Sequence, residues 1–157
     1  MEDVITTFGI MKFFGIRAAV AIVTGFIIGI ERTLTNHAAG IKTIVLVSLG
    51  SCLFSSLSFY LHILYPQSDP TRIIGQIITG IGFLGAGVIF MSQTQSKLLG
   101  LTSSAMIWTS CALGVMAGAG LYVVPFFASI TIVTVIVILK KIEEFIDRND
   151  PPRNGTS

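Results

Sequence analysis

The stretch that most constrains the fold is residues 71–91, TRIIGQIITGIGFLGAGVIFM, which is apolar and carries no charge after Arg72. Its length suits a membrane-spanning helix of about 19 residues, and its glycines suit the close approach of neighbouring helices. On a helical period, small side chains fall on one face, namely Gly75, Thr79, Gly82 and Ala86. We therefore expect a membrane helix whose small face contacts another helix, within one chain or between two copies.

The same stretch contains GIGFLG, residues 80–85, which fits the G-x-G-x-x-G pattern of dinucleotide-binding loops. That pattern requires a preceding strand, a following soluble helix and an acidic residue about 20 positions further on. Residues 100–110 contain neither Asp nor Glu. The pattern therefore favours helix packing over a cofactor loop, and we expect no bound cofactor.

The composition also indicates a membrane protein, because 52% of the 157 residues are hydrophobic and only 11% are charged. A soluble domain carries about 25% charged residues. The net charge of +2, without a basic cluster, argues against a nucleic-acid partner. Cys52 and Cys111 lie in apolar runs and offer neither metal-ligand spacing nor a disulfide framework. His37 and His62 complete no catalytic set, so we expect no catalytic and no metal-binding residues.

Four further apolar runs accompany the glycine-rich stretch, and the predicted spans are about 13–30, 41–64, 73–91, 101–118 and 121–139. The expected fold is all-α: a compact bundle of five transmembrane helices within a domain of residues 1–145. Residues 146–157 are expected to form a short disordered cytoplasmic tail.

Small residues spaced four apart recur in three of these spans and predict close helix contacts. The predicted packing positions are Gly25, Gly29, Gly75, Gly82, Ala86, Gly114 and Gly118.

A polar stripe follows one side of the second span, with spacings of three and four residues that place its members within about one quadrant of a helix. Its members are Ser48, Ser51, Ser55, Ser58 and His62. Hydrogen bonds between helices are one interpretation, each contributing about 0.6 kcal/mol. A hydroxyl-lined ion path is the other. The first is favoured because no acidic residue joins the stripe, whereas ion pathways usually carry one.

The distribution of lysine and arginine predicts the orientation. One side of the membrane receives Arg32, Lys42, Lys97, Lys140, Lys141, Arg148 and Arg153. The other receives Lys12 and Arg72, with Arg17 inside the first span on that half. We therefore expect the N-terminus outside and the C-terminus in the cytoplasm.

The few charges near the ends of the spans are the candidate functional residues, because a charge at that depth needs a partner, water or a headgroup. Glu31, Arg32 and Lys42 are expected together near the cytoplasmic surface, with Glu31 able to pair with Lys42. A second set, near the outer surface, comprises Arg17, Asp69 and Arg72, and Arg17 could pair with Asp69. Anchoring of the bundle is the alternative role for both sets.

Several phrases together resemble the MgtC/SapB family of bacterial inner-membrane proteins. They include GIER at 29–32, AGIKT at 39–43, DPTRI at 69–73, GIGFLGAGVI at 80–89, GLTSSA at 100–105 and GAGLY at 118–122. Lys42 stands where the family usually has arginine, and Leu99 also replaces an arginine. The virulence-associated members continue into a soluble C-terminal domain, so this chain resembles the short form of the family.

The resemblance implies a regulatory membrane protein that acts on other membrane proteins in adaptation to low magnesium or stress. The family has been linked to the proton-translocating ATP synthase and to sensor kinases, which makes these the expected partners beside the lipid bilayer. A homodimer is also expected, because so small a bundle is readily completed by a second copy. The alternative function is a small ion transporter or channel with a serine-lined path.

Overall fold

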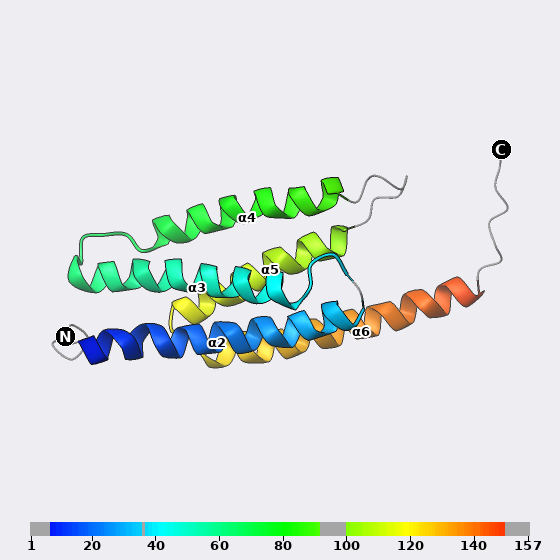
Figure 1. Ribbon diagram of the computed structural model, residues 1–157, viewed down its shortest axis with the longest axis horizontal. Coiled ribbons are helices and arrows are strands. Elements are labelled where there is room, and N and C mark those ends of the chain that lie inside the picture. Colours follow the sequence, from blue (N-terminus) through cyan, green and yellow to red (C-terminus); the bar gives the residue numbers. More distant parts are fainter. Residues whose placement is uncertain (1–6, 36, 92–99, 150–157) are drawn as a thin grey trace.

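The computed structural model describes residues 7–35, 37–91 and 100–149, and all of its regular structure is helical. Five helices follow one another: α2 (Thr7–Leu34), α3 (Ile41–Leu64), α4 (Thr71–Met91), α5 (Leu101–Gly118) and α6 (Val123–Asn149). They run back and forth along one long axis (Figure 1), and each is long and apolar enough to cross a membrane. The expected all-α bundle of five transmembrane helices is confirmed.

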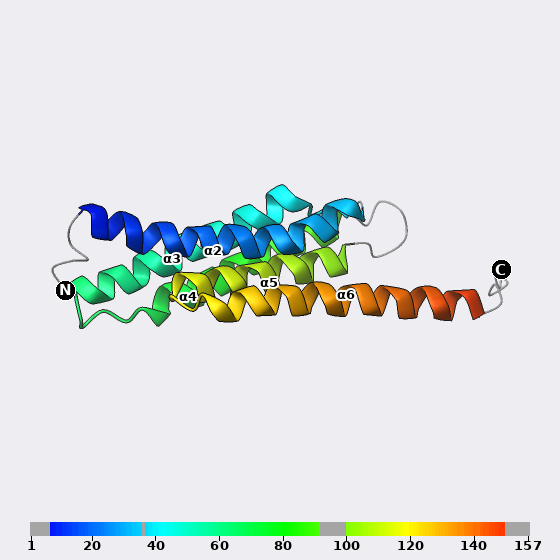
Figure 2. The same ribbon diagram turned by 90° about the horizontal axis from the view of Figure 1, so that it is seen from below.

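Two helices extend well beyond the predicted spans. α2 begins at Thr7 and ends at Leu34, and α6 continues to Asn149. Residues 146–149 are therefore helical rather than part of a disordered tail, and residues 150–157 lie outside the described residues. The last turns of α6 project past the other helices (Figure 2), because their charged side chains are suited to water rather than to a helix contact.

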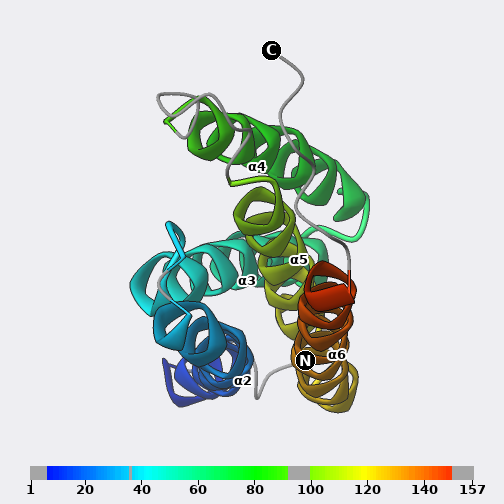
Figure 3. The same cartoon turned by 90° about the vertical axis from the view of Figure 1, so that its right-hand side faces the viewer.

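α5 is the central helix of the bundle (Figure 3) and contacts each of the other four. Half of its membrane-spanning segment is buried, compared with 11% for α4 and for α6. α2, α3 and α5 thus form the packed core, whereas α4 and α6 lie at the periphery. We call the end that carries the start of α2 the N-side of the bundle, and the opposite end the C-side.

Close backbone contacts within this core depend on glycine. A Cβ at Gly25 would lie 3.0 Å from the Cα of Val45, and one at Gly29 would lie 2.7 Å from the Cα of Ile41. Both contacts join α2 to α3. On α5, a Cβ at Gly118 would lie 2.5 Å from the carbonyl oxygen of Cys52, and one at Gly114 would overlap the carbonyl of Ser48. These four glycines let three helices approach at backbone distance, as small residues do in membranes.

Among the described residues, the predicted small face of α4 is not a contact surface. Gly75, Thr79, Gly82 and Ala86 are all exposed, and a Cβ at Gly75 or Gly82 would meet nothing within 4 Å. α4 instead packs on α5 through an adjacent side, where Ile81 and Gly85 are buried. The prediction of a contact within one chain is therefore wrong, and a contact between two copies stays a prediction.

Gly114→Ala should destabilise the bundle, because the added methyl group would overlap backbone of α3 that cannot move aside cheaply. We expect a loss of about 1–3 kcal/mol, typical of overpacking. Gly82→Ala is the matched control, since its methyl group enters open space. Thermal unfolding of both variants in detergent measures the difference. Equal melting temperatures would contradict the assignment of Gly114 as a contact position.

Candidate functional site

The serine stripe of α3 forms hydrogen bonds between elements of the bundle. The hydroxyl of Ser48 donates to the carbonyl of Ala21 at 2.9 Å, and that of Ser55 donates to the carbonyl of Val115 at 3.2 Å. Ser51 donates to the sulfur of Cys111 at 3.2 Å, and Ser58 donates to the carbonyl of Pro70 at 2.8 Å.

The remaining polar groups along this seam are engaged in the same way. The Nδ1 of His62 donates to the carbonyl of Ser68 at 2.6 Å, which ties the end of α3 to the loop that follows it. From the other side, Ser110 of α5 donates to the carbonyl of Ile44 at 2.9 Å. The hydroxyls therefore hold helices together, and each serine of the stripe already donates a hydrogen bond within the bundle.

Arg17 on α2 caps the C-terminus of α5 at the N-side of the bundle. Its Nη1 donates to the carbonyl of Gly118 at 2.7 Å, and its guanidinium carbon lies 3.5 Å from the centre of the Phe13 ring. The last carbonyls of a helix lack partners within the helix and carry partial negative charge, so an arginine is stabilised there. This contact replaces the predicted pair between Arg17 and Asp69.

The turn that follows α5 explains why the Gly118 carbonyl is available. Gly120 has φ of 87°, and its N–H donates to the carbonyl of Ala117 at 3.0 Å. The N–H of Leu121 donates to the carbonyl of Met116 at 3.0 Å. This pair of hydrogen bonds is the Schellman arrangement, which requires a left-handed residue at the position of Gly120. It leaves the Gly118 carbonyl for Arg17.

Arg32, near the other end of α2, makes the corresponding contact at the start of α5. Its side chain is 1% exposed, and its Nη2 donates to the hydroxyl of Ser103 at 3.2 Å. Its Nη1 lies 3.7 Å from the Oε2 of Glu31, whose side chain is 10% exposed. A buried guanidinium is strongly unfavourable without an opposite charge, so Glu31 is its neutralising partner.

Two atoms of this pair are buried without a hydrogen-bond partner, namely Nε of Arg32 and Oε2 of Glu31. Glu31 also lines a cavity of about 450 Å³ between α2 and α6, together with Lys140, Lys141 and Glu144. The unpartnered atoms and the charged lining make this cluster the polar centre of the C-side. We define it as the Arg32 cluster: Glu31, Arg32, Thr35, His37, Ser103 and Lys140.

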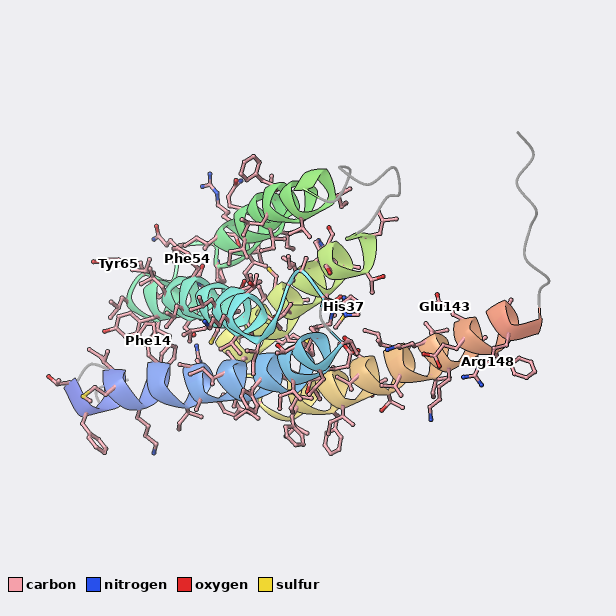
Figure 4. All side chains as sticks on the ribbon, turned by 45° about the vertical axis from the view of Figure 1, so that its right-hand side comes forward. Phe14, His37, Phe54, Tyr65, Glu143 and Arg148 are labelled. Atoms are coloured by element: carbon pink, nitrogen blue, oxygen red, sulfur yellow. The ribbon has the colours of Figure 1, made fainter. Side chains whose placement is uncertain are left out.

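His37 belongs to the loop between α2 and α3 (Figure 4), where its Nδ1 lies 2.5 Å from the Thr35 hydroxyl. His37 is exposed, but partial desolvation of its ring lowers its pKa below the ordinary value, and the positive charge of Arg32 lowers it further. The charge of Glu31 acts in the opposite direction, whereas Lys140 also lowers the pKa. The neutral imidazole is therefore the favoured form beside this cationic cluster.

The three other predicted charges lie apart from both arginine contacts. Lys42 is exposed and lines a groove between α3 and α4 rather than pairing with Glu31. Arg72 lines the same groove further toward the N-side. Asp69 accepts the N–H of Thr71 at 2.9 Å and its hydroxyl at 2.7 Å, which caps α4. These hydrogen bonds lower the pKa of Asp69, with a smaller contribution from the charge of Arg72.

The expected grouping of Glu31, Arg32 and Lys42 is thus only partly formed, and Arg17, Asp69 and Arg72 share one end of the bundle without forming one site. Sequence reasoning missed Ser103 and the Gly118 carbonyl as the partners of the two arginines. Ser103 lies within the GLTSSA segment at residues 100–105, but helical periodicity does not predict which side chain of another helix it contacts.

The chemistry available to the Arg32 cluster is charge pairing and hydrogen bonding. In residues 7–35, 37–91 and 100–149, no three His, Cys, Asp or Glu side chains are grouped to hold a metal ion. Cys52 and Cys111 are free thiols in the core, away from the cavity between α2 and α6. The cluster is therefore suited to bind a polar or charged group that enters beside α6.

Glu31→Gln should leave the buried guanidinium of Arg32 without a neutralising charge. We expect a loss of about 3 kcal/mol, because breaking a buried pair from one side costs roughly 3–5 kcal/mol. The double variant Glu31→Gln/Arg32→Met should recover most of this loss, since it removes both charges. Glu143→Gln on the exposed part of α6 is the control. Unfolding in detergent gives the stability of the unmodified protein and of the three variants. A double variant no more stable than Glu31→Gln would refute the pairing.

His37 should make stability depend on pH. Because its pKa is lowered in the folded state, its contribution is complete above the unfolded pKa, about 6.5, and is lost as pH falls through that value. We expect the melting temperature in detergent to fall between about pH 7.5 and pH 5.5, and to fall less in His37→Gln. Lys140→Gln, which removes one repelling charge, should lie between the two. The same pH dependence in all three proteins would exclude this role.

Comparison with known proteins agrees with the geometry of a membrane bundle. The sequence profile of the MgtC family matches residues 18–145. The protein SapB of Bacillus subtilis (strain 168) is 38% identical over 112 residues, which cover 68% of this chain and 48% of that protein. The protein MgtC of Brucella abortus (strain 2308) is 36% identical over 127 residues, or 81% of this chain and 51% of that protein.

A third relative is named putative magnesium transporter YhiD, from Escherichia coli (strain K12). It is 34% identical over 134 residues, which cover 82% of this chain and 61% of that protein. This chain thus spans about half to three fifths of the length of these relatives. No solved structure matches it. With a profile match that runs from the first helix to the last, this multi-pass membrane protein belongs to the MgtC family.

Proposed function

We propose that this chain is a regulatory protein of the bacterial inner membrane, which binds other membrane proteins during adaptation to low magnesium or stress. Family membership supports the connection to magnesium, since one relative is named MgtC and another a putative magnesium transporter. Its partners, by the family resemblance, are the ATP synthase or a sensor kinase, and a second copy of the chain completes the assembly.

The observation that carries this proposal is the contrast between the inner and outer helices. The hydroxyls of α3 form hydrogen bonds within the bundle. In α4 and α6, by contrast, only 11% of the residues in the membrane-spanning segment are buried, and large side chains point outward. Phe83 on α4 is 82% exposed, and Phe127 on α6 is 62% exposed. Such faces suit contacts with lipid or with a partner's transmembrane helices. The exposed small face of α4 is the place for a second copy.

Magnesium transport is the second candidate, because one relative carries that name. Mg²⁺ binds through carboxylates and retained waters. The residues that line the groove between α3 and α4 include no carboxylate, and Lys42 and Arg72 put positive charge toward its two ends. Repulsion of a divalent cation by both lysine and arginine disfavours this groove as its path.

Partner capture under magnesium limitation tests the proposal. Cells that express the tagged chain are cross-linked at low and at high magnesium, and its membrane partners are identified. We expect a defined partner enriched at low magnesium, and its loss in Phe83→Ala or Phe127→Ala would identify the face that binds it. Both variants remove an exposed ring and leave the core intact, so membrane abundance should not change.

Reconstitution provides the opposing measurement. Liposomes that contain the purified protein should show no more Mg²⁺ uptake than empty liposomes. Saturable uptake that is lost in Ser51→Ala or Ser55→Ala would overturn the regulatory proposal and favour transport. Equal recovery of every partner with an unrelated tagged membrane protein would also count against it.

A further inference from the structure

A groove of about 1010 Å³ runs between α3 and α4 on the outside of the bundle. This volume is at the upper end of the roughly 300–1,000 Å³ typical of small-molecule sites. Its walls are apolar and include Leu46 and Phe54 on α3 and Ile73, Ile77 and Leu84 on α4. Gly50 and Gly80 also line it, and a Cβ at either position would meet nothing within 4 Å. The two helices therefore leave open space along an apolar surface that faces the membrane.

Polar groups lie at both ends of the groove, with Lys42 and Thr43 at the C-side and a second pair at the N-side. Arg72 is at the start of α4, and Gln76 follows one helical turn deeper. Both side chains are exposed, and within the described part of the chain neither makes a side-chain hydrogen bond or an ion pair, although the charge of Arg72 acts on the carboxylate of Asp69. An amide without a partner is unfavourable in the membrane. These two side chains therefore present unused donors to whatever occupies the groove.

The charge of the groove is positive. Arg72 and Lys42 are the charged residues that line it, and no carboxylate does. The neighbouring carboxylate of Asp69 is held by Thr71 and lies outside the lining. An anionic group would consequently be attracted to the groove. The Arg72 end suits a phosphate better than the Lys42 end, because guanidinium can bind phosphate through two hydrogen bonds whereas an ammonium is a point charge.

The length of the apolar wall fits a lipid tail. Arg72 and Leu84 are twelve residues apart on α4, which corresponds to roughly 18 Å along the helix. The hydrocarbon thickness of one leaflet is about 15 Å, half of a core of about 30 Å. A molecule with its phosphate at Arg72 would thus extend its chains to about the level of Leu84.

We propose that this groove is a binding site for an anionic phospholipid. The Arg72 guanidinium binds the phosphate, the Gln76 amide donates to a glycerol ester carbonyl, and the acyl chains lie between Phe54 and Leu84. A transmembrane helix of a second copy is less suited to the groove, because it would leave Arg72 and Gln76 without acceptors. The small face of α4, on the other side of the helix, offers such a helix a better contact.

Native mass spectrometry of the purified protein in detergent measures this binding directly. The probes are phosphatidylglycerol and phosphatidylcholine with identical acyl chains. We expect phosphatidylglycerol to bind about tenfold more tightly, and Arg72→Gln to remove that preference. Lys42→Gln is the matched control at the other end of the groove and should retain it.

A second pair of variants tests the position of the acyl chains. Gly80→Trp should fill the groove and weaken binding of both lipids, whereas Gly82→Trp points away from it and should bind lipid normally. Melting temperatures establish that each variant is folded, and Gly80→Ala provides a smaller obstruction if Gly80→Trp is unstable.

Three results would overturn the proposal. Equal affinity for the two lipids would exclude recognition of an anionic headgroup. Loss of the preference in Lys42→Gln rather than Arg72→Gln would place the headgroup at the other end. The unmodified protein could also form a dimer that the Gly80→Trp variant does not form. If neither of these two proteins binds lipid, that result would identify a second copy as the occupant. None of these results depends on the regulatory role, which is measured by partner capture.

Discussion

Two arginines of α2 hold the two ends of α5, and the arrangement of the bundle depends on these contacts. Arg17 bonds to Gly118 and Arg32 bonds to Ser103, so the paired positions are 15 residues apart on both helices. Fifteen residues are about four helical turns, which brings both arginines to the same side of α2. α2 and α5 therefore run antiparallel in a defined register, and α3 is held against them through glycines that allow backbone contact.

The dipole of α5 explains why the two arginines need different neighbours. The C-terminus of a helix carries partial negative charge, so the Gly118 carbonyl itself stabilises Arg17. The N-terminus carries partial positive charge, so Arg32 beside Ser103 faces an unfavourable field in addition to its burial. Glu31 is adjacent to Arg32 and supplies the missing negative charge, whereas Asp69 is free to cap α4. The dipole of α5 thus explains why Arg32 needs a carboxylate beside it and Arg17 does not.

The core helices satisfy one another's polar groups, so the surface that remains exposed lies mainly on the peripheral helices. The hydroxyls of α3 bond to neighbouring carbonyls, which leaves little polar surface inside the bundle for an ion to follow. α4 contacts mainly α5 and diverges from α3 along the groove, while α6 projects beyond the C-side. Glu143 and Arg148 lie on that projection (Figure 4), outside the packed core. The outer helices accordingly expose most of the large apolar side chains that the core helices do not cover.

The sequence by itself determined the five helices, since an apolar segment in a membrane must satisfy its backbone hydrogen bonds internally. It also determined that glycines such as Gly114 and Gly118 would permit close helix–helix contact, and that the serines of α3 would form hydrogen bonds to neighbouring helices. Only the tertiary structure decided which small face is used: Gly114 meets α3, whereas Gly82 remains exposed. The reason is that every face of these helices is apolar, so no amphipathic pattern distinguishes a lipid-facing side from a packed one. The partners of Arg17 and Arg32 depend on that same choice, because they lie on a helix more than 70 residues away in the chain.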